Sequence, residues 1–276
     1  MPRTGRTELG EVRYDTRRGK GNAPMDLGLS GKKVILTGGS RGIGRAALEL
    51  FAAEGCDIAF ISRNADQVAE TVNALSAHGG KVIGQALDLL DHGAYTAWLK
   101  SAAEQLGGCD IFVPGASASG MGATGDWDAC LNADVKGTVL GCETLQPWLE
   151  KSDAPAIVIM ASTAATETFV APQAFNAMKA ALITYAGQLG QALGPLGIRV
   201  NCVSPGPIKF PGGNWEAIKA VAPEFYDATE KQFALGRWGG PEEVARTIVF
   251  LASPASSYTT GTNVVIDGGY TKRVQF

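Results

Sequence analysis

The stretch that decides the fold spans residues 37–44 and reads Thr37-Gly38-Gly39-Ser40-Arg41-Gly42-Ile43-Gly44. It follows a short apolar run at 34–36, which is typical of a buried parallel strand, and a helical stretch from about Ile43 to Ala53 comes next. Glycines at such a turn let the backbone approach a pyrophosphate, and the helix N-terminus adds partial positive charge. A glycine-rich turn without a ligand is the plainer alternative, but the strand–turn–helix setting favours a dinucleotide-binding loop.

The same alternation of strand and helix patterns continues along the chain. The expected strands lie at 58–61, 81–87, 111–113, 156–160, 198–203 and 263–266, and the expected helices at 65–78, 91–106, 127–149, 172–193 and 242–251. This order predicts an α/β fold with a Rossmann-type, doubly wound parallel sheet of about seven strands and helices on both faces. Composition does not change after residue 30, so residues 25–276 are expected to form a single domain. The long irregular stretch near 205–237 has the length of a substrate lid.

Composition narrows the possible partners. The 276 residues are 45% hydrophobic and 18% charged, and the net charge of −3 disfavours nucleic acid or an anionic membrane. Five cysteines without a C-x-x-C pair indicate neither a disulfide framework nor a metal site, and they favour a reducing, cytoplasmic setting. No apolar run approaches the roughly 20 residues that a membrane span requires. Residues 1–24 carry six Lys/Arg and three Asp/Glu with few large apolar side chains, which predicts a flexible N-terminal arm.

The residue type at the end of the second expected strand indicates whether NAD or NADP is bound. An acidic residue there would bind the ribose 2′-hydroxyl, but the chain has Ser62-Arg63-Asn64. Arg63 can bind a 2′-phosphate through paired N–H groups with Arg41 nearby, whereas two solvated arginines are the alternative. Asp88, followed by Leu89, either accepts from the adenine amino group or caps the next helix. The sequence therefore predicts NADP(H) rather than NAD.

Residues 31 to about 270 resemble the short-chain dehydrogenase/reductase family. The features that carry the resemblance are the 37–44 loop, Asp88, Ser162, Lys179, Pro205-Gly206-Pro207-Ile208 and Gly261-Thr262 with Asp267-Gly268-Gly269. The resemblance implies an NADP(H)-dependent oxidoreductase that interconverts a carbonyl and an alcohol, built as a homotetramer or homodimer. Together with the motifs it gives this expected cofactor-binding set: Gly38, Ser40, Arg41, Gly42, Ile43, Gly44, Ser62, Arg63, Asn64, Asp88, Leu89, Ala116, Lys179, Pro205, Gly206 and Ile208.

The expected catalytic positions contain one marked departure from the family. The resemblance assigns Lys179 to the nicotinamide ribose and Ser162 to the substrate carbonyl. The family tyrosine lies four residues before the lysine and thirteen after the serine, and both counts reach Phe175. Asp134 stands where the family has the asparagine of its proton relay, and residues 114–117 read Pro-Gly-Ala-Ser instead of Asn-Asn-Ala-Gly.

Phe175 keeps the ring but has no ionisable hydroxyl, and loss of general acid–base help costs typically about 10²–10⁴-fold in rate. Three explanations stay open: a variant of an ordinary enzyme, an enzyme that protonates through Lys179, Ser162, Asp134 or water, or an NADP(H)-binding protein without efficient turnover. Tyr185 lies six residues past Lys179, on a different helix face. The aromatic residues of the 205–237 stretch predict either a lipophilic or cyclic substrate or packing within the lid: Phe210, Trp215, Phe225, Tyr226 and Phe233.

Overall fold

A seven-stranded parallel sheet organises the protein in a computed structural model that describes residues 26–122, 124–168 and 172–274. The strands are β1 (Lys33–Thr37), β2 (Asp57–Ser62), β3 (Val82–Ala86), β4 (Ile111–Pro114), β5 (Ala156–Met160), β6 (Arg199–Pro205) and β7 (Asn263–Ile266). Their order is β3-β2-β1-β4-β5-β6-β7, with every neighbouring pair parallel, which confirms the predicted fold class. The order reverses between β1 and β4, where such sheets bind ligands. The predicted arm at 1–24 lies outside the described residues.

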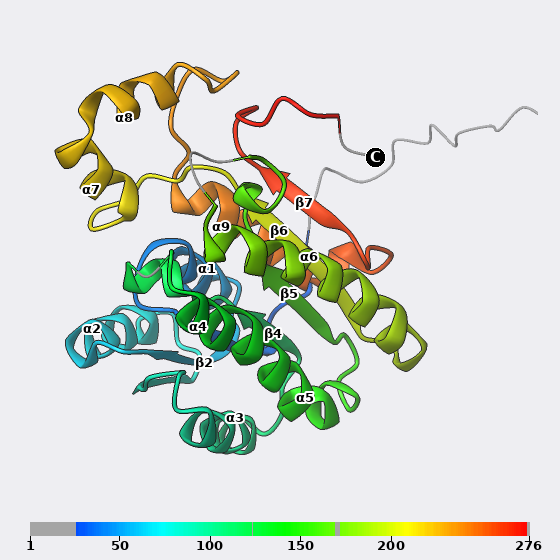
Figure 1. The fold of residues 1–276 in the computed structure, drawn as a ribbon. Coiled ribbons are helices and arrows are strands. Elements are labelled where there is room, and N and C mark those ends of the chain that lie inside the picture. The colour runs from blue at the N-terminus through cyan, green and yellow to red at the C-terminus, as the bar shows by residue number, and fades with distance from the viewer. Residues whose placement is uncertain (1–25, 123, 169–171, 275–276) are drawn as a thin grey trace, which may run out of the picture.

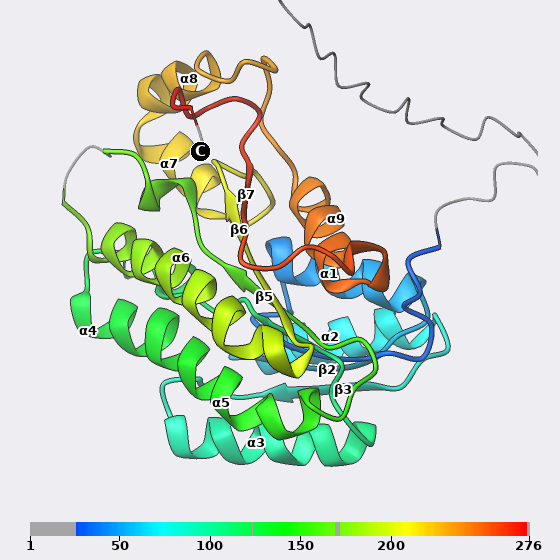
Figure 2. The same cartoon turned by 90° about the vertical axis from the view of Figure 1, so that its right-hand side faces the viewer.

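Helices cover both faces of this sheet (Figures 1 and 2). One layer holds α1 (Gly42–Ala53), α2 (Ala65–Ser76) and α9 (Pro241–Ala252), and the other holds α3 (His92–Leu106), α5 (Gly137–Leu149) and α6 (Ala174–Leu193). Each layer encloses its own core, so alternate residues of one strand belong to different cores: Val34 and Leu36 to the first, Ile35 to the second. Burial on both faces explains why the central strands are apolar throughout rather than alternating.

The helix expected over 127–149 is interrupted. It consists of α4 (Trp127–Cys130), the π-helical segment η2 (Leu131–Lys136) and α5. Wide π turns occur frequently at functional sites, and this one carries Asp134. None of the described helices combines the length and apolar character needed to cross a bilayer.

The stretch expected to be irregular near 205–237 contains two short helices, α7 (Asn214–Val221) and α8 (Pro223–Glu230). In Figure 1 they lie together beyond the carboxyl ends of the central strands, apart from the two helix layers. Each has only eight residues, and Pro223 begins α8 at a position where proline is tolerated. The expectation of a wholly irregular stretch was therefore wrong, because two short helices lie within it.

Candidate active site

A cavity of about 640 Å³ lies at the carboxyl ends of β1, β4, β5 and β6. It extends from the 38–44 loop and the ends of β2 and β3, past the first turn of α6, to α7. The cavity therefore spans the point where the strand order reverses, the usual ligand site of an open parallel sheet.

The glycine loop leaves no room for side chains where a pyrophosphate would lie. Gly38 has φ +80°, and a Cβ there would be 3.0 Å from the Ala116 backbone. A Cβ on Gly44 would lie 2.1 Å from the Gly38 carbonyl oxygen. Helix α1 begins at Gly42 without a side-chain cap, so its first backbone N–H groups are available to an anion. The residues present thus fit the phosphates of a dinucleotide.

Two guanidinium groups converge beside the end of β2. Arg41 Nη2 donates to the Gly120 carbonyl oxygen at 2.7 Å, and Arg63 Nη2 donates to the same oxygen at 3.2 Å. Arg41 Nη1 also donates to the Gly212 carbonyl oxygen at 3.1 Å. A phosphate offers several charged acceptor oxygens in place of these carbonyls, so the paired arginines suit a 2′-phosphate.

Asp88 and Leu89 line the cavity at the end of β3. Asp88 Oδ1 accepts from the Leu90 N–H at 3.0 Å in a local turn. The cap of α3 is Asp91, whose Oδ1 accepts from the Ala94 N–H at 2.9 Å. The alternative role of Asp88 as helix cap is therefore wrong, and its carboxylate stays at the cavity wall.

Ser40 and Asn64, two expected cofactor residues, do not line the cavity. Ser40 Oγ donates to Gln67 Oε1 at 3.1 Å and accepts from the Ser62 hydroxyl at 2.7 Å. Asn64 caps α2 by accepting from the Gln67 N–H at 2.9 Å. Ser40 therefore ties the glycine loop to Ser62 and Gln67, whereas Asn64 stabilises the start of α2.

The turn after β4 is held by hydrogen bonds to its backbone, although residues 114–117 lack the asparagines of the family. Thr37 Oγ1 accepts from the backbone N–H groups of Gly115 and Ala116, each at 3.1 Å. At the end of β6, a Cβ on Gly206 would lie 2.5 Å from the Cβ of Asp267. These close approaches hold both expected segments, with Ala116, Pro205, Gly206 and Ile208, at the cavity wall.

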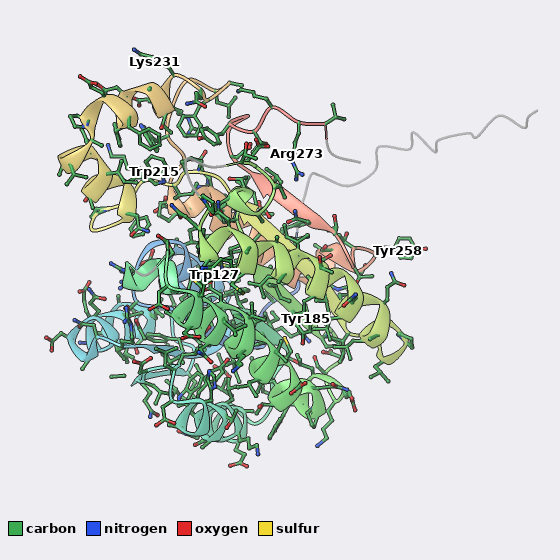
Figure 3. The ribbon with its side chains drawn as sticks, in the orientation of Figure 1. Trp127, Tyr185, Trp215, Lys231, Tyr258 and Arg273 are labelled. Atoms are coloured by element: carbon green, nitrogen blue, oxygen red, sulfur yellow. The ribbon has the colours of Figure 1, made fainter. Side chains whose placement is uncertain are left out.

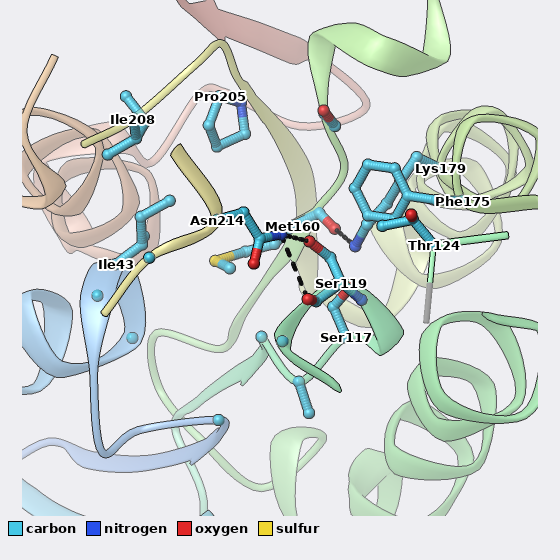
Figure 4. Close-up of a pocket in the computed structure, with 18 of the residues that line it drawn as sticks. Ile43, Ser117, Ser119, Thr124, Met160, Phe175, Lys179, Pro205, Ile208 and Asn214 are labelled. Atoms are coloured by element: carbon cyan, nitrogen blue, oxygen red, sulfur yellow. Dashed lines mark hydrogen bonds between the residues drawn. The ribbon is translucent and has the colours of Figure 1, made fainter. Parts of the chain in front are cut away.

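Ser162, Phe175 and Lys179 come together on one wall of the cavity. Ser162 Oγ accepts from the Ala164 N–H at 3.1 Å, which leaves its own hydrogen available to a substrate oxygen. Lys179 Nζ lies 5.6 Å from the centre of the Phe175 ring and donates to the Met160 carbonyl oxygen at 2.8 Å (Figure 4).

Asp134, the fourth expected catalytic residue, lies behind Lys179 rather than in the cavity. Its Oδ1 is 2.9 Å from Lys179 Nζ, and the two side chains are 0% and 4% exposed. Its Oδ2 accepts from the Ala118 N–H at 2.9 Å. Asp134 therefore reaches the cavity only through the lysine.

The cavity is also lined by residues that no motif predicted: Glu167, Gln173, Asn176, Asn214 and Tyr270. Asn214 Nδ2 donates to Ser119 Oγ at 2.8 Å, which joins α7 to the 3-10 turn η1 (Ala118–Met121), as Figure 4 shows. Gln173 and Asn176 flank Phe175 and could have been found from that position. Asn214 and Tyr270 lie far away in sequence and belong to no motif.

The aromatic residues of the lid divide between the two predicted roles. Phe210 and Trp215 line the cavity, and Figure 3 shows Trp215 on the lid helices. Tyr226 and Phe233 are buried and pack on Trp238 with ring centres 4.4 and 5.2 Å apart. The lid thus has an aromatic core of its own and presents only part of its rings to a ligand.

Tyr185 does not take the place of the missing tyrosine, because it lies outside the cavity lining. Its hydroxyl hydrogen-bonds with Cys142, and burial raises the pKa of this phenol above its usual range. Within the described ranges, no group of three or more His, Cys, Asp or Glu residues is placed to hold a metal ion.

A glycine loop at the first βα turn, with serine and lysine across the same cavity, defines a Rossmann-type oxidoreductase. A family model described as enoyl-(acyl carrier protein) reductase matches residues 38–271. The chain belongs to the short-chain dehydrogenase/reductase family.

The relatives are oxidoreductases and match most of the chain. Isoepoxydon dehydrogenase of Penicillium expansum is 36% identical over 257 residues, which cover 91% of this chain and 99% of the relative. D-threitol dehydrogenase of Mycolicibacterium smegmatis is 32% identical over 254 residues, or 90% and 95% of the two chains. The structure of L-sorbose reductase from Gluconobacter frateurii, complexed with NADPH and L-sorbose, gives a TM-score of 0.84 at 29% identity. It covers 91% of this chain and all of that one (100%).

Proposed function

We propose that this chain is an NADP(H)-dependent oxidoreductase that interconverts a carbonyl and an alcohol. The observation that carries the proposal is one cavity with the glycine loop and two arginines at one end and Ser162 with Lys179 at the other. The relative solved with NADPH supports a nicotinamide cofactor in this position. The arginine pair favours the 2′-phosphorylated form over NAD.

The residues of the reacting end have separable roles in this proposal. NADPH held by these residues would supply a hydride for the carbonyl carbon, whose oxygen would take up one proton. The free hydrogen of the Ser162 hydroxyl orients that oxygen, and Lys179 holds the nicotinamide ribose. Phe175 lines the cavity with Ser162 and Lys179 but cannot donate a proton, so in this proposal water supplies it. Activity should therefore be about 10²–10⁴-fold below that of a site with a hydroxyl acid.

The lining indicates a cyclic substrate with polar substituents. Phe175, Trp215 and Tyr270 offer ring faces to an apolar surface. The amides of Gln173 and Asn176 line the same cavity and have no hydrogen-bond partner among the described residues, so they are available to substrate oxygens. This combination supports a ring that is lipophilic on its face and oxygenated at its edge.

Assembly and location are part of the same proposal. Exposed apolar side chains support a homotetramer or homodimer that would cover them. Examples are Trp127, which is 57% exposed, and Tyr258, which projects from the edge of the molecule in Figure 3. All five cysteines lie in the described part of the chain, are buried and form no disulfide, which suits the reducing cytoplasm. Light scattering on the purified chain measures the assembly directly.

Fluorescence titration with NADPH, alongside NADPH oxidation on a panel of aromatic and cyclic ketones, tests the function. We expect saturable binding and slow oxidation by the native chain. The Phe175→Tyr variant should raise turnover about a hundredfold, because it restores a proton donor beside the carbonyl. Tight binding without oxidation by either protein would indicate a cofactor-binding protein without efficient turnover. Absence of binding to both NADPH and NADH would refute the proposal.

A further inference from the structure

The ammonium group of Lys179 is buried, and the groups around it determine how its charge is balanced. The residue is 3% exposed, and its Nζ contacts the Met160 carbonyl oxygen, Asp134 Oδ1 and the face of the Phe175 ring. An aromatic ring face attracts a cation only modestly. Of the three contacts, Asp134 alone carries a full opposite charge.

The geometry around Asp134 demands a carboxylate rather than an amide. Oδ2 accepts from the Ala118 N–H at 2.9 Å, and Oδ1 faces the ammonium at 2.9 Å without an aligned hydrogen-bond donor of its own. An asparagine in this pose has one acceptor oxygen and one NH₂ group. Whichever way it were turned, the NH₂ would meet either the backbone N–H or the ammonium.

Because Asp134 and Lys179 are both buried, the stability of the fold depends on their ion pair. Removing one member of a buried ion pair leaves an uncompensated charge, whereas removing both can be nearly neutral. The π-helical segment η2 projects the carboxylate to the back of Lys179, on the side away from the cavity. The lysine charge is thus balanced by a fixed residue of the protein, not by a group that enters with the cofactor or substrate.

We infer that Asp134 is a positioning residue matched to Phe175. Its carboxylate neutralises Lys179 and fixes it against Met160, so the lysine field at position 175 is cancelled in a site that has no hydroxyl to activate. A tyrosine introduced at 175 would meet a lysine already paired with Asp134. The benefit of Phe175→Tyr therefore depends on residue 134. This inference rests on the proposed function for its catalytic consequence, but not for the ion pair itself.

A thermal and urea unfolding cycle tests the charge pairing without any substrate. It compares the native chain with Asp134→Asn, Lys179→Met and the double variant. We expect each single variant to be less stable than the native chain. The double variant should be more stable than the sum of the two losses predicts, by at least tenfold in the unfolding equilibrium constant. Asp128→Asn, an exposed acid in the preceding helix turn, is the matched control and should change little. Additive losses, or a double variant that fails to fold, overturn the inference.

A second cycle tests the positioning role with the Phe175→Tyr, Asp134→Asn and combined variants. We expect the gain in kcat from Phe175→Tyr to be at least tenfold larger when residue 134 is asparagine. Equal gains in the two backgrounds would show that Asp134 has no influence on the reacting end, even if it stabilises the fold. If no variant oxidises NADPH, the proposed function fails, while the unfolding cycle still decides whether the pair is coupled.

Discussion

At the scale of single residues, the proposed preference for NADP(H) rests on two side chains that meet at one carbonyl oxygen. Arg41 and Arg63 both donate to the Gly120 carbonyl oxygen, so a phosphate placed there would gain two charge-assisted contacts. Neither arginine forms an ion pair with an acidic residue in the described part of the chain. Their charge is therefore available to a ligand.

Arg63→Gln should weaken NADPH binding selectively. A charge-assisted hydrogen bond contributes about 1.5–3 kcal/mol, which corresponds to roughly 10–100-fold in Kd. NADH lacks the 2′-phosphate, so its Kd should stay within about twofold. Fluorescence titration with both nucleotides measures the difference, with Arg246→Gln, an exposed arginine on α9, as control. An equal loss for NADPH and NADH would contradict a role in 2′-phosphate recognition.

Gly44→Ala should damage the cofactor loop. The added Cβ would lie 2.1 Å from the Gly38 carbonyl oxygen, so the turn must shift. Overpacking of this kind costs about 1–3 kcal/mol, and NADPH affinity should fall with it. Gly93→Ala is the control, because its Cβ meets only Asp91 Oδ1 at an ordinary 3.5 Å. Urea unfolding and NADPH titration should show a loss of stability and affinity for Gly44→Ala but not for Gly93→Ala. Equal losses in the two variants would contradict a tightly packed glycine loop.

Residue spacing predicts functional positions only where a motif fixes them. Ser162 and Lys179 were expected from the family resemblance, and Phe175 from counts of thirteen and four from them. All three line the cavity. Asn214 and Tyr270 reach it too, but their approach depends on how distant segments pack, which local spacing does not encode. Asp134 was expected to act at the position of the family's relay asparagine. It lies behind Lys179 and accepts from the Ala118 N–H.

At the scale of elements, the start of α9 is held by a local ionic cluster. Glu243 accepts from Arg237 Nη1 and Nη2 at 2.9 and 2.7 Å and from the Gly240 N–H at 2.9 Å. These donors, Arg237 foremost, lower the pKa of Glu243 from 4.5 to about 2. A depressed carboxyl pKa stabilises the fold above the unfolded value and ceases to do so as pH falls through the folded value.

Glu243→Gln should therefore remove a small pH-dependent part of stability. The native chain should lose this contribution between pH 4.5 and about 2. The variant should be less stable than the native chain at pH 7 and approach it at the acid end. The effect should be modest, because the Arg237 and Glu243 side chains are 58% and 34% exposed. Melting temperatures across that range measure it, with exposed Glu242→Gln as control, and a pH-independent difference would contradict the assignment.

Periodicity predicted the regular elements of the sheet layers well, because their apolar faces repeat along each segment. The strand at 156–160 was predicted with its observed bounds. The π-helical segment η2 was missed, since one extra residue in a turn hardly changes the apolar pattern. Helices α7 and α8 were missed because eight residues give too few turns for a clear period.

At the scale of the whole molecule, Trp238 joins the aromatic core of the lid to a residue of the cavity wall. Its ring packs on Tyr226 and Phe233 and lies 4.9 Å from Trp215, a cavity residue. A backbone bridge between Ile208 and Gly239 ties the two ends of the lid together. Ring packing around one tryptophan thus connects the lid core to the substrate side of the cavity.

Trp238→Ala should destabilise the lid more than the cofactor-binding end of the cavity. Truncation of a packed tryptophan costs about 3–5 kcal/mol, and the loss should be local because the lid has its own aromatic core. We expect faster proteolysis within 209–240 and a KM for the carbonyl substrate raised roughly tenfold, with NADPH affinity nearly unchanged. Trp238→Phe is the matched control: it keeps a ring and removes the buried indole N–H, which has no hydrogen-bond partner among the described residues. That variant should retain lid order and KM, and an equal loss in both would show that the indole itself, rather than ring packing, holds the lid.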